Sequence, residues 1–365
     1  MKFTISKQAF LDAIQQVQHV VSARTTLAIL SNVLLKAKPG VLELTTTDLD
    51  VGVSGTVAAD VEASGATTLP ARRLATIIRE LPADEVHVTV DEKNVASIQS
   101  GPSTFKLLGL TSEEFPPLPR FDGGSEFTMK QADLRDCLRR TAYSISTDET
   151  RYVLNGILFA FKDNLLTMVA TDGRRLAMVE HEMEFPQSHE IEFIVPTKAV
   201  NELQRILGDE GEVTIKVTGS QAGFDMGNGL LVTKLIEGNY PNYRQVIPGD
   251  PKERISIERE SFLRSVSRVS LLASEKSNSV KLIFTQGNVE IVAASQDIGE
   301  ARESLAIPYK GPNMTIAFNP EYLMAPLRNL TTDEISLNLI DEISPGVIRV
   351  GNTFLYVLMP MRVTA

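Results

Sequence analysis

The sequence contains one cysteine, Cys137, and no tryptophan in 365 residues. A single cysteine excludes an internal disulfide and any metal cluster held by several thiolates, and it fits a reducing compartment. The four histidines, His19, His87, His181 and His189, have no metal-ligand spacing to one another or to acidic residues. We therefore interpret each histidine as a structural or surface residue and expect no metal site.

The sequence also lacks both common phosphate-binding glycine motifs, G-x-x-x-x-G-K-[ST] and G-x-G-x-x-G. Together with the histidine pattern, this absence leads us to expect no cofactor. No run of 18 or more apolar residues is present, which argues against a transmembrane helix. The start, MKFTISKQAF, has neither the apolar core nor the cleavage site of a secretion signal, so we expect a cytoplasmic protein without a membrane partner.

Charge of one sign is in excess, with a formal net charge of −10. Taken alone, this sum argues against nucleic acid as a partner. The chain is 43% hydrophobic and 22% charged, as in globular proteins with packed cores, and 365 residues are too many for one ordinary domain. The number and bounds of the domains must therefore be found from repeats within the sequence.

Three stretches of the chain begin alike and define what we call copies 1, 2 and 3. They read FTISKQAFLDAI from Phe3, FTMKQADLRDCL from Phe127 and ISIERESFLRSV from Ile255. Shifts of 124 and 252 residues also superpose Phe10 on Leu134 and Phe262, and Ile14 on Leu138 and Val266. Because apolar residues four apart share one helix face, each start predicts a short strand followed by an amphipathic helix.

A second helix is predicted in each copy by TTLPARRLATIIREL, FIVPTKAVNELQRIL and IAFNPEYLMAPLRNL. Their prolines, Pro70, Pro196 and Pro320, stand at or just before the helix start, where a missing N–H does no harm. Helices should begin near Lys7, Ala71, Gln131, Thr197, Arg259 and Asn319, which are 64, 60, 66, 62 and 60 residues apart. A fixed spacing of this kind indicates a repeated architecture.

Strand-like runs rich in Val, Ile and Thr, such as NLLTMVATDG and NVEIVAAS, separate these helices. Each copy is thus predicted to be strand-helix-three strands, twice over, in an α+β fold. Phe115-Pro116, Tyr240-Pro241 and Met359-Pro360 close the copies, which places the boundaries near 119–124 and 248–252.

The six predicted helices carry positive charge although the chain is acidic. Residues 7–20, 71–81, 131–143, 197–207, 259–273 and 319–330 hold 13 Lys/Arg against 7 Asp/Glu, a net of +6 that leaves −16 for the rest of the chain. If all six helices face one way, they form a weakly basic surface that attracts phosphate without regard to base sequence.

The candidate phosphate-binding residues on and beside these helices are Arg24, Arg72, Arg73, Arg79, Arg135, Arg139, Arg140, Lys198, Arg205, Arg264 and Arg268. A solvated helix face is the alternative reading for any one of them. The repetition over six helices favours the binding surface.

No catalytic constellation emerges from the comparison of the copies. Cys137 aligns with Ala13 and Ser265, so a small residue in helix packing explains it better than a nucleophile does. Asp48 and Asp172 both follow a threonine in matching places, which favours a turn role over a catalytic carboxylate. Two pieces differ in residues from the matching places of the other copies: Gly173-Arg174-Arg175-Leu176 is peculiar to copy 2, and the methionine-rich end Met359-Pro360-Met361-Arg362 is peculiar to copy 3. Adaptable methionines are common on surfaces that accept several partners.

In MKFT, RTTLAILSNVLL, RYVLNGILF, VATDGRRLA, GNYPNYRQVIP and MPMR, the chain resembles the bacterial beta sliding clamp, the processivity subunit of DNA polymerase III. The resemblance covers all 365 residues. It implies three similar DNA-clamp domains, at 1–120, 125–248 and 252–365, and two chains joined head to tail in a closed ring. Helices would line the hole and antiparallel sheets would form the outside.

The resemblance also implies a partner-peptide cleft between the second and third domains. By motif, its residues here are Leu154, Thr171, Gly173, Arg174, Arg175, Leu176, Pro241, Val246, Asn319, Tyr322, Ile343, Val357, Met359, Pro360, Met361 and Arg362. Such a cleft would take a short extended peptide with a glutamine and terminal hydrophobic residues. The DNA polymerase III catalytic subunit, the clamp loader complex, and other polymerases and repair proteins would compete for it.

The same resemblance implies a dimer interface and contacts to double-stranded DNA. Phe105 and Leu107 would meet Leu271 and Leu272 of the other chain in the homodimer, with Arg73 facing Glu300 or Glu303. Tyr152 would join Arg24 and Lys198 on the DNA. The chain departs from the family's usual pattern at Arg174, at Asn242 and at its Val363-Thr364-Ala365 end, and this end bears on the shape of the cleft.

The function implied is a DNA sliding clamp that encircles duplex DNA and confers processivity, without catalysis. Two alternatives remain. An enzyme with a site between the repeats would need a convergent set of catalytic groups. A repeat scaffold that binds proteins without encircling DNA would not need basic helices.

Overall fold

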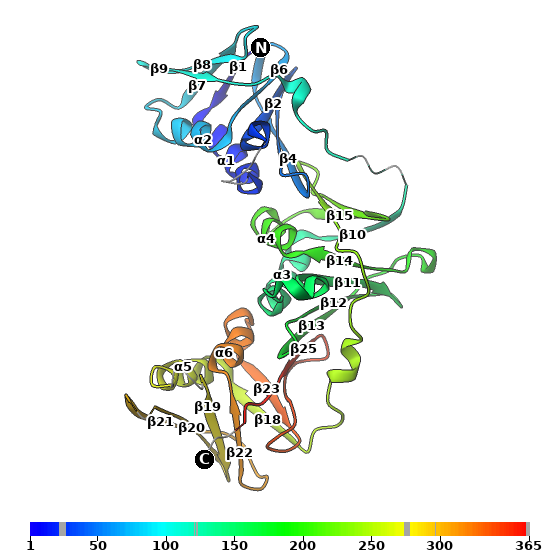
Figure 1. The fold of residues 1–365 in the computed structure, drawn as a ribbon, viewed down its shortest axis with the longest axis vertical. Helices are drawn as coiled ribbons and strands as arrows, with labels where there is room; N and C mark the ends of the chain where they lie inside the picture. The colour runs from blue at the N-terminus through cyan, green and yellow to red at the C-terminus, as the bar shows by residue number, and fades with distance from the viewer. Residues whose placement is uncertain (22–26, 120, 122, 274–277, 296, 363–365) are drawn as a thin grey trace. The chain divides into compact units, whose positions relative to one another are not determined.

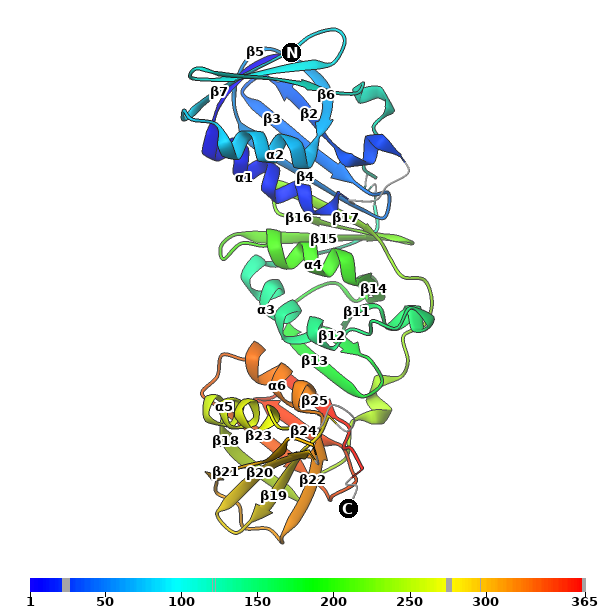
Figure 2. The same cartoon turned by 60° about the vertical axis from the view of Figure 1, so that its left-hand side comes forward.

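The computed structural model describes residues 1–21, 27–119, 121, 123–273, 278–295 and 297–362. Figures 1 and 2 show its helices and strands from two directions. By their contacts the described residues form two compact units. Unit 1 comprises residues 1–135 and 198–235, and unit 2 comprises residues 136–197 and 236–365.

The α-helices begin where the repeats predict them. They are α1 (Lys7–Val17), α2 (Ala71–Glu80), α3 (Gln131–Thr141), α4 (Thr197–Ile206), α5 (Arg259–Ser270) and α6 (Pro320–Asn329). Three short 3₁₀ turns lie in copy 1: η1 (Gln18–Val20), η2 (Ala28–Ser31) and η3 (Ser112–Glu114). Four more follow: η4 (Ala142–Ser144), η5 (Glu149–Leu154), η6 (Gln187–His189) and η7 (Tyr243–Val246). No described helix is long and apolar enough to cross a membrane.

Side chains next to the helix starts explain why the helices begin there. The Ser6 hydroxyl accepts a hydrogen bond from the Ala9 N–H at the start of α1. The Asn319 side-chain oxygen does the same for the N–H groups of Glu321 and Tyr322 in α6. Such caps bind backbone donors that have no partner within the helix.

Unit 1 contains two antiparallel sheets. The first has the order β5-β1-β7-β8-β9, formed by β1 (Lys2–Ser6), β5 (Asp60–Ala63), β7 (Glu85–Val90), β8 (Val95–Ser100) and β9 (Ser103–Leu108). The second has the order β10-β15-β16-β17-β4-β3-β2-β6. Its copy 1 strands are β2 (Asn32–Lys38), β3 (Val41–Thr47), β4 (Val51–Ala58) and β6 (Gly65–Pro70). Its copy 2 strands are β10 (Ser125–Lys130), β15 (Glu212–Thr218), β16 (Gln221–Asp225) and β17 (Gly229–Lys234).

Unit 2 repeats this plan with copies 2 and 3. Its eight-stranded sheet has the order β14-β11-β12-β13-β25-β24-β23-β18. The strands from copy 2 are β11 (Gly156–Lys162), β12 (Leu165–Thr171), β13 (Arg175–Glu182) and β14 (Ile191–Pro196). Those from copy 3 are β18 (Glu253–Glu258), β23 (Glu334–Leu339), β24 (Gly346–Val350) and β25 (Phe354–Leu358). The four-stranded sheet β21-β20-β19-β22 is formed by β19 (Val280–Thr285), β20 (Asn288–Ser295), β21 (Gly299–Ala306) and β22 (Met314–Phe318).

Copies 2 and 3 follow the predicted strand-helix-three strands, twice over. For copy 1 the prediction was short by one strand, because β5 adds to the edge of the first sheet beside β1. β5 is mostly exposed and carries little apolar surface, so its sequence gives no strand signal.

Each eight-stranded sheet joins strands of two copies. β17 of copy 2 pairs with β4 of copy 1, and Val232 faces Gly52 in that register. β13 of copy 2 pairs with β25 of copy 3, and Leu176 faces Val357. We call these pairings the first and second seam. The helices α1 and α2 pack side by side in unit 1, as α5 and α6 do in unit 2 (Figure 2).

Candidate partner cleft and nucleic-acid face

Two turns of the same construction lie at the two seams. At the turn between β3 and β4, Asp48 Oδ1 accepts hydrogen bonds from the N–H groups of Asp50 (3.0 Å) and Val51 (2.8 Å). At the turn between β12 and β13, Asp172 Oδ1 accepts from Arg174 (2.9 Å) and Arg175 (3.1 Å). The predicted turn role of both aspartates is confirmed.

The residue after each aspartate has the same unusual backbone conformation. Gly173 has a φ of 85° and Leu49 a φ of 81°. Only glycine adopts this left-handed region without strain, because a Cβ crowds the neighbouring carbonyl. The glycine that distinguishes copy 2 therefore fits its turn, whereas the leucine of copy 1 is held there by the surrounding structure.

The second seam provides an apolar floor for the candidate cleft. Leu176 on β13 faces Val357 on β25, which in turn faces Val347 on β24. These three side chains are buried in one cluster with Leu158, Ala160, Val169, Ile194, Tyr243 and Leu355. Val153, Met178, Ile236, Tyr240 and Ile247 pack against the cluster from partly exposed positions.

The methionine-rich chain end runs from β25 onto this seam. The Met359 N–H donates to the Arg174 carbonyl (3.0 Å), and the Met361 N–H donates to the Ala317 carbonyl (2.7 Å). The Met359 residue is 45% exposed, Pro360 and Met361 are half-buried and Arg362 is exposed. The structure thus brings together the piece peculiar to copy 2 and the piece peculiar to copy 3. Val363, Thr364 and Ala365 lie outside the described residues.

Arg175 is the best-anchored cation of the candidate cleft. Its Nε donates to Asp172 Oδ2 (3.1 Å), and both side chains are about 15% exposed. Its guanidinium carbon lies 4.4 Å from the ring centroid of Tyr322 on α6, a distance at which a cation and an aromatic face attract. The Tyr356 hydroxyl donates to the Tyr322 carbonyl (2.7 Å), and burial raises the pKa of Tyr356 well above its ordinary value. A neutral phenol therefore supports the tyrosine on which Arg175 stacks.

The other predicted cleft residues have varied environments in unit 2. Leu154 is buried, Thr171 Oγ1 donates to the Arg175 carbonyl (2.6 Å), and Asn319 caps the helix that carries Tyr322. Pro241, Val246 and Ile343 are exposed, Ile343 to 85%.

Sequence comparison did not single out Tyr143, Tyr243 and Tyr356. Tyr143 lies under the Arg175 guanidinium at 5.9 Å, and Tyr243 belongs to the apolar floor. In the sequence these tyrosines look like any aromatic residues of a core. Only the folded structure shows that they lie beside the candidate cleft.

Most of the predicted phosphate-binding arginines have a carboxylate partner within the chain. Arg135 pairs with Asp209, Arg139 and Arg140 share Asp136, Arg205 pairs with Glu202, Arg264 with Glu260 and Arg268 with Glu303. Arg72 donates to the Val21 carbonyl. Arg73 and Arg79, both exposed on α2, have no ion pair with any carboxylate that the structure describes. The positive charge of the helices is thus largely compensated locally.

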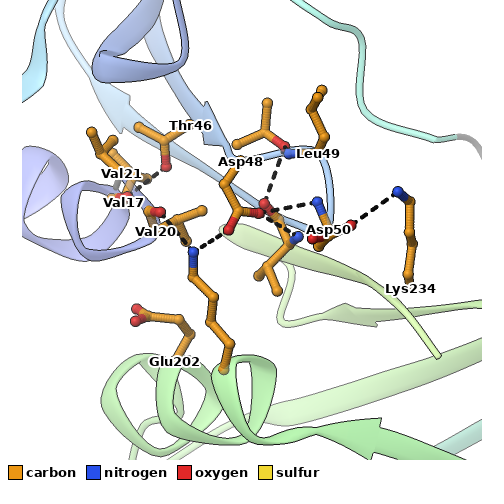
Figure 3. A network of polar contacts seen from close by, with 12 residues as sticks. Val17, Val20, Val21, Thr46, Asp48, Leu49, Asp50, Glu202 and Lys234 are labelled. Atoms are coloured by element: carbon orange, nitrogen blue, oxygen red, sulfur yellow. Dashed lines mark hydrogen bonds and ion pairs between the residues drawn. The ribbon is translucent and has the colours of Figure 1, made fainter. Parts of the chain in front are cut away.

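Asp48 lies within a network of polar contacts in unit 1 (Figure 3). The Lys198 ammonium donates to Asp48 and to the Val20 carbonyl (3.1 Å). Burial raises the pKa of the Asp48 carboxyl, but the bonds from Lys198, Val51 and Asp50 outweigh it and hold the pKa below its ordinary value of 3.8. Lys198 therefore joins copy 2 to copy 1, with two of its three donors engaged.

Glu202, one helical turn after Lys198, is a buried carboxylate in this region. Its Oε1 accepts from Arg205 (3.3 Å), while Oε2 has no hydrogen-bond partner within the described structure. Burial raises the pKa of Glu202, and the positive charges of Arg205, His19 and Lys198 reduce the rise.

The remaining predicted contacts to DNA are Tyr152 and Arg24. Tyr152, in η5, is 57% exposed. Arg24 lies outside the described residues. Within the residues described, no three His, Cys, Asp or Glu side chains gather as a metal site, and Cys137 is buried on α3.

The predicted interface residues lie at two sheet edges and one helix end. Phe105 and Leu107 are on β9, the last strand of the five-stranded sheet, and both keep exposed surface. Glu300 and Glu303 are on β21, the last strand of the four-stranded sheet. Leu271, just after α5, is 78% exposed, and Leu272 is half-buried. Glu303 is already bound by Arg268 and Ser265, and Glu300 by Arg302.

Comparison with known protein families assigns all three copies. Models of the DNA polymerase III beta subunit match residues 1–119 (N-terminal domain), 128–242 (central domain) and 244–362 (C-terminal domain). The chain belongs to the DNA polymerase III beta subunit family. The resemblance to the bacterial beta sliding clamp is thereby confirmed, with one domain model for each copy.

Individual beta subunits are similar along their whole length. The beta sliding clamps of Chlamydia muridarum and Pseudomonas putida are each 35% identical to this chain. Each alignment covers 99% of this chain, and it covers 99% of the Chlamydia muridarum protein and 100% of the Pseudomonas putida protein. Among solved structures, the sliding clamp of Pseudomonas aeruginosa bound to griselimycin has a TM-score of 0.95 at 34% identity. The sliding clamp of Bacillus subtilis has a TM-score of 0.94 at 31% identity. Both comparisons cover 100% of this chain and 100% of the solved structure.

Proposed function

We propose that this chain is a DNA sliding clamp that encircles duplex DNA as a head-to-tail homodimer and tethers the replicative polymerase. The observation that carries the proposal is the match of the whole chain, copy by copy, to the DNA polymerase III beta subunit and to beta sliding clamps. The proposal includes the three domains 1–120, 125–248 and 252–365, a cytoplasmic location and action without catalysis.

Two sheet edges support ring closure. β9 and β21 each end a sheet, and an exposed edge strand is a template for pairing with another chain. Leu108 on β9 is 73% exposed and Leu271 beside α5 is 78% exposed, so apolar surface lies near both edges. In a head-to-tail dimer each edge of one chain would meet the other edge of its partner, and two such contacts close the ring.

The charge of the helices suits enclosure of DNA better than tight binding. Local carboxylates compensate most of the arginines, and Arg73 and Arg79 on α2 are exceptions among the described residues. A surface of this kind makes few phosphate contacts that salt can break. It would therefore let the duplex slide, while the closed ring prevents its escape.

We assign the partner-peptide cleft to the second seam in unit 2. The apolar floor around Leu176 and Val357 would take hydrophobic side chains, and Met359 and Met361 would adapt to different partners. Arg175, held by Asp172 and stacked on Tyr322, would orient polar groups of an extended peptide. The polymerase III catalytic subunit, the clamp loader and other polymerases and repair proteins would bind there.

Retention on circular DNA tests the clamp function. Protein loaded on a nicked circle by a clamp loader should elute with the DNA in gel filtration and should leave it when a restriction enzyme cuts the circle. A scaffold that binds proteins only would not be retained at all. A protein that stayed equally well on the cut DNA would be an ordinary DNA binder, and the topological proposal would fail.

A separate measurement tests the cleft. Met361→Ala should weaken binding of a fluorescent peptide taken from the polymerase's clamp-binding segment, because it removes an adaptable apolar side chain from the proposed cleft. The hydrogen bond from the backbone N–H of residue 361 to the Ala317 carbonyl can still form in this variant. Met183→Ala is the matched control, because Met183 follows the end of β13 that lies away from Arg175 and also donates its backbone N–H, to the Asn164 carbonyl. Equal affinities of the two variants would refute the assignment of the cleft.

A further inference from the structure

The segment that connects copies 1 and 2 packs on the first seam. Gly52 on β4 is buried, and a Cβ placed there would lie 3.5 Å from Leu118 Cγ and would overlap Leu118 Cδ2. A Cβ at Gly223 on β16 would lie 2.6 Å from Cε2 of Phe121. Both side chains of the connecting segment thus occupy space that any residue other than glycine would need.

The two glycines lie in one row across three neighbouring strands. Gly52 on β4 faces Val232 on β17, and Val232 faces Gly223 on β16. Residues directly opposite in an antiparallel sheet point to the same face. The row therefore presents two shallow positions on either side of Val232, and Leu118 and Phe121 occupy them from the same side.

This row corresponds to the floor of the candidate cleft. Thr47 faces Gly52 as Thr171 faces Leu176, and each threonine begins one of the two aspartate turns. In the second seam the row reads Leu176, Val357, Val347, and its own side chains form a buried floor. In the first seam glycines stand at the places of Leu176 and Val347, and the chain itself supplies the apolar side chains.

We infer that the first seam is a peptide groove occupied by the chain's own connecting segment, of which the structure describes residues 116–119 and Phe121. Its described residues form neither helix nor strand and are apolar, with three prolines, Pro116, Pro117 and Pro119, around Leu118. Prolines restrict the free segment, so little conformational entropy is lost when it docks. The inference rests on the proposed cleft at the second seam, and it explains why each chain would offer one open cleft although it has two seams.

The fit leaves some space beside the segment. A cavity of about 100 Å³ is bounded by Leu49, Asp50, Lys234 and the segment's residues Pro116 to Pro119. Lys234 Nζ donates to Asp50 Oδ1 (2.9 Å) at its rim. The groove is therefore closed by its occupant and by an ion pair across the seam, not by large side chains of the sheet.

A thiol-reactivity experiment tests whether the segment is docked in solution. Cys137 is buried, so a cysteine introduced as Leu118→Cys reports on the segment. It should react with a thiol reagent at least about tenfold more slowly than Glu113→Cys, which is exposed on η3. Adding Gly52→Val should abolish this protection, while Gly219→Val, which has open space around its Cβ, should not. Equal reactivity of positions 118 and 113 would overturn the inference.

A binding experiment tests whether the groove accepts a peptide as ligand. In a Met361→Ala background, Leu118→Ser with Phe121→Ser should let the groove bind one labelled peptide of residues 113–123 per chain. The protein with its own segment intact should not bind that peptide, and Gly52→Val should block the vacated groove. A folded variant that binds no peptide would show that the segment only packs. Because Met361→Ala removes the proposed cleft, failure here is distinct from failure of the cleft.

Discussion

The Lys198 ammonium on α4 donates a hydrogen bond to the Asp48 carboxylate in the turn between β3 and β4. The two residues come from different copies, so their ion pair spans the first seam. At the second seam the equivalent Asp172 binds Arg175 of its own turn instead, and Arg175 reaches copy 3 by stacking on Tyr322. The same kind of aspartate turn therefore lies at both seams, but its carboxylate binds Lys198 at the first seam and Arg175 at the second.

The Asp48–Lys198 pair makes the stability of unit 1 depend on acid pH. Because the pKa of Asp48 is lowered in the folded protein, its stabilising effect is complete above its ordinary value of 3.8 and is lost as pH falls through the lower folded pKa. Asp48→Asn should therefore cost about 1 kcal/mol at pH 7, after allowance for screening of the half-exposed lysine. The difference from the native chain should shrink below pH 4 in urea unfolding.

The control for this pair is Lys198→Met, which should give a similar loss at neutral pH. If the difference between the native chain and Asp48→Asn stayed constant from pH 7 to pH 3, the lowered pKa would not be a source of stability.

Leu49 and Gly173 make a matched test of backbone strain. Leu49→Gly should raise the free energy of unfolding by up to about 1 kcal/mol, because relief of the left-handed conformation exceeds the added freedom of the unfolded chain. Gly173→Ala, at a φ of 85°, should lower it by about 1 kcal/mol. Denaturant titration of both variants measures whether each change raises or lowers the free energy of unfolding. If both changes lowered it, contacts of the Leu49 side chain would outweigh the strain of its backbone.

Arg175 should contribute to peptide binding through its planar guanidinium. Arg175→Lys keeps the charge but loses the forked donor and the stack on Tyr322, so peptide affinity should fall about fivefold to tenfold. Arg328→Lys on the exposed side of α6 is the control. Fluorescence anisotropy with one labelled peptide measures both. Tyr322→Leu should reduce the peptide affinity by about the same factor. The double variant should bind only slightly more weakly than either single variant. If the two reductions in affinity multiplied, the residues would act independently and the proposed coupling would be wrong.

Leu271 and Ile343 allow the proposed interface and cleft to be separated. Both side chains are apolar and exposed, Leu271 to 78% and Ile343 to 85%. Leu271→Glu should sediment as a monomer of 40.0 kDa and still bind peptide, since a charge buried against apolar residues is costly. Ile343→Glu should remain a dimer and bind peptide more weakly. A dimeric Leu271→Glu variant would contradict the interface, and unchanged peptide affinity of Ile343→Glu would remove that residue from the cleft.

Internal comparison of the copies predicted the local structure well. All six helix starts and both aspartate turns are local features, set by capping residues, apolar spacing and side chains that bind backbone two or three residues away. The distinct pieces Gly173–Leu176 and Met359–Arg362 could also be recognised as unusual. Neither pattern indicated that these pieces meet, since β13 and β25 are far apart in the chain.

The sequence by itself determined the three copies, their helices and the family, because each of these is written in short-range pattern and residue identity. Only the tertiary structure decided which strands join the copies, which carboxylates neutralise the helix arginines, and which apolar side chains cover the glycine row of the first seam. The physical reason is that strand pairing and ion pairing depend on proximity in space. Lys198 and Asp48, separated by 150 positions, are neighbours in unit 1, where β17 of copy 2 pairs with β4 of copy 1.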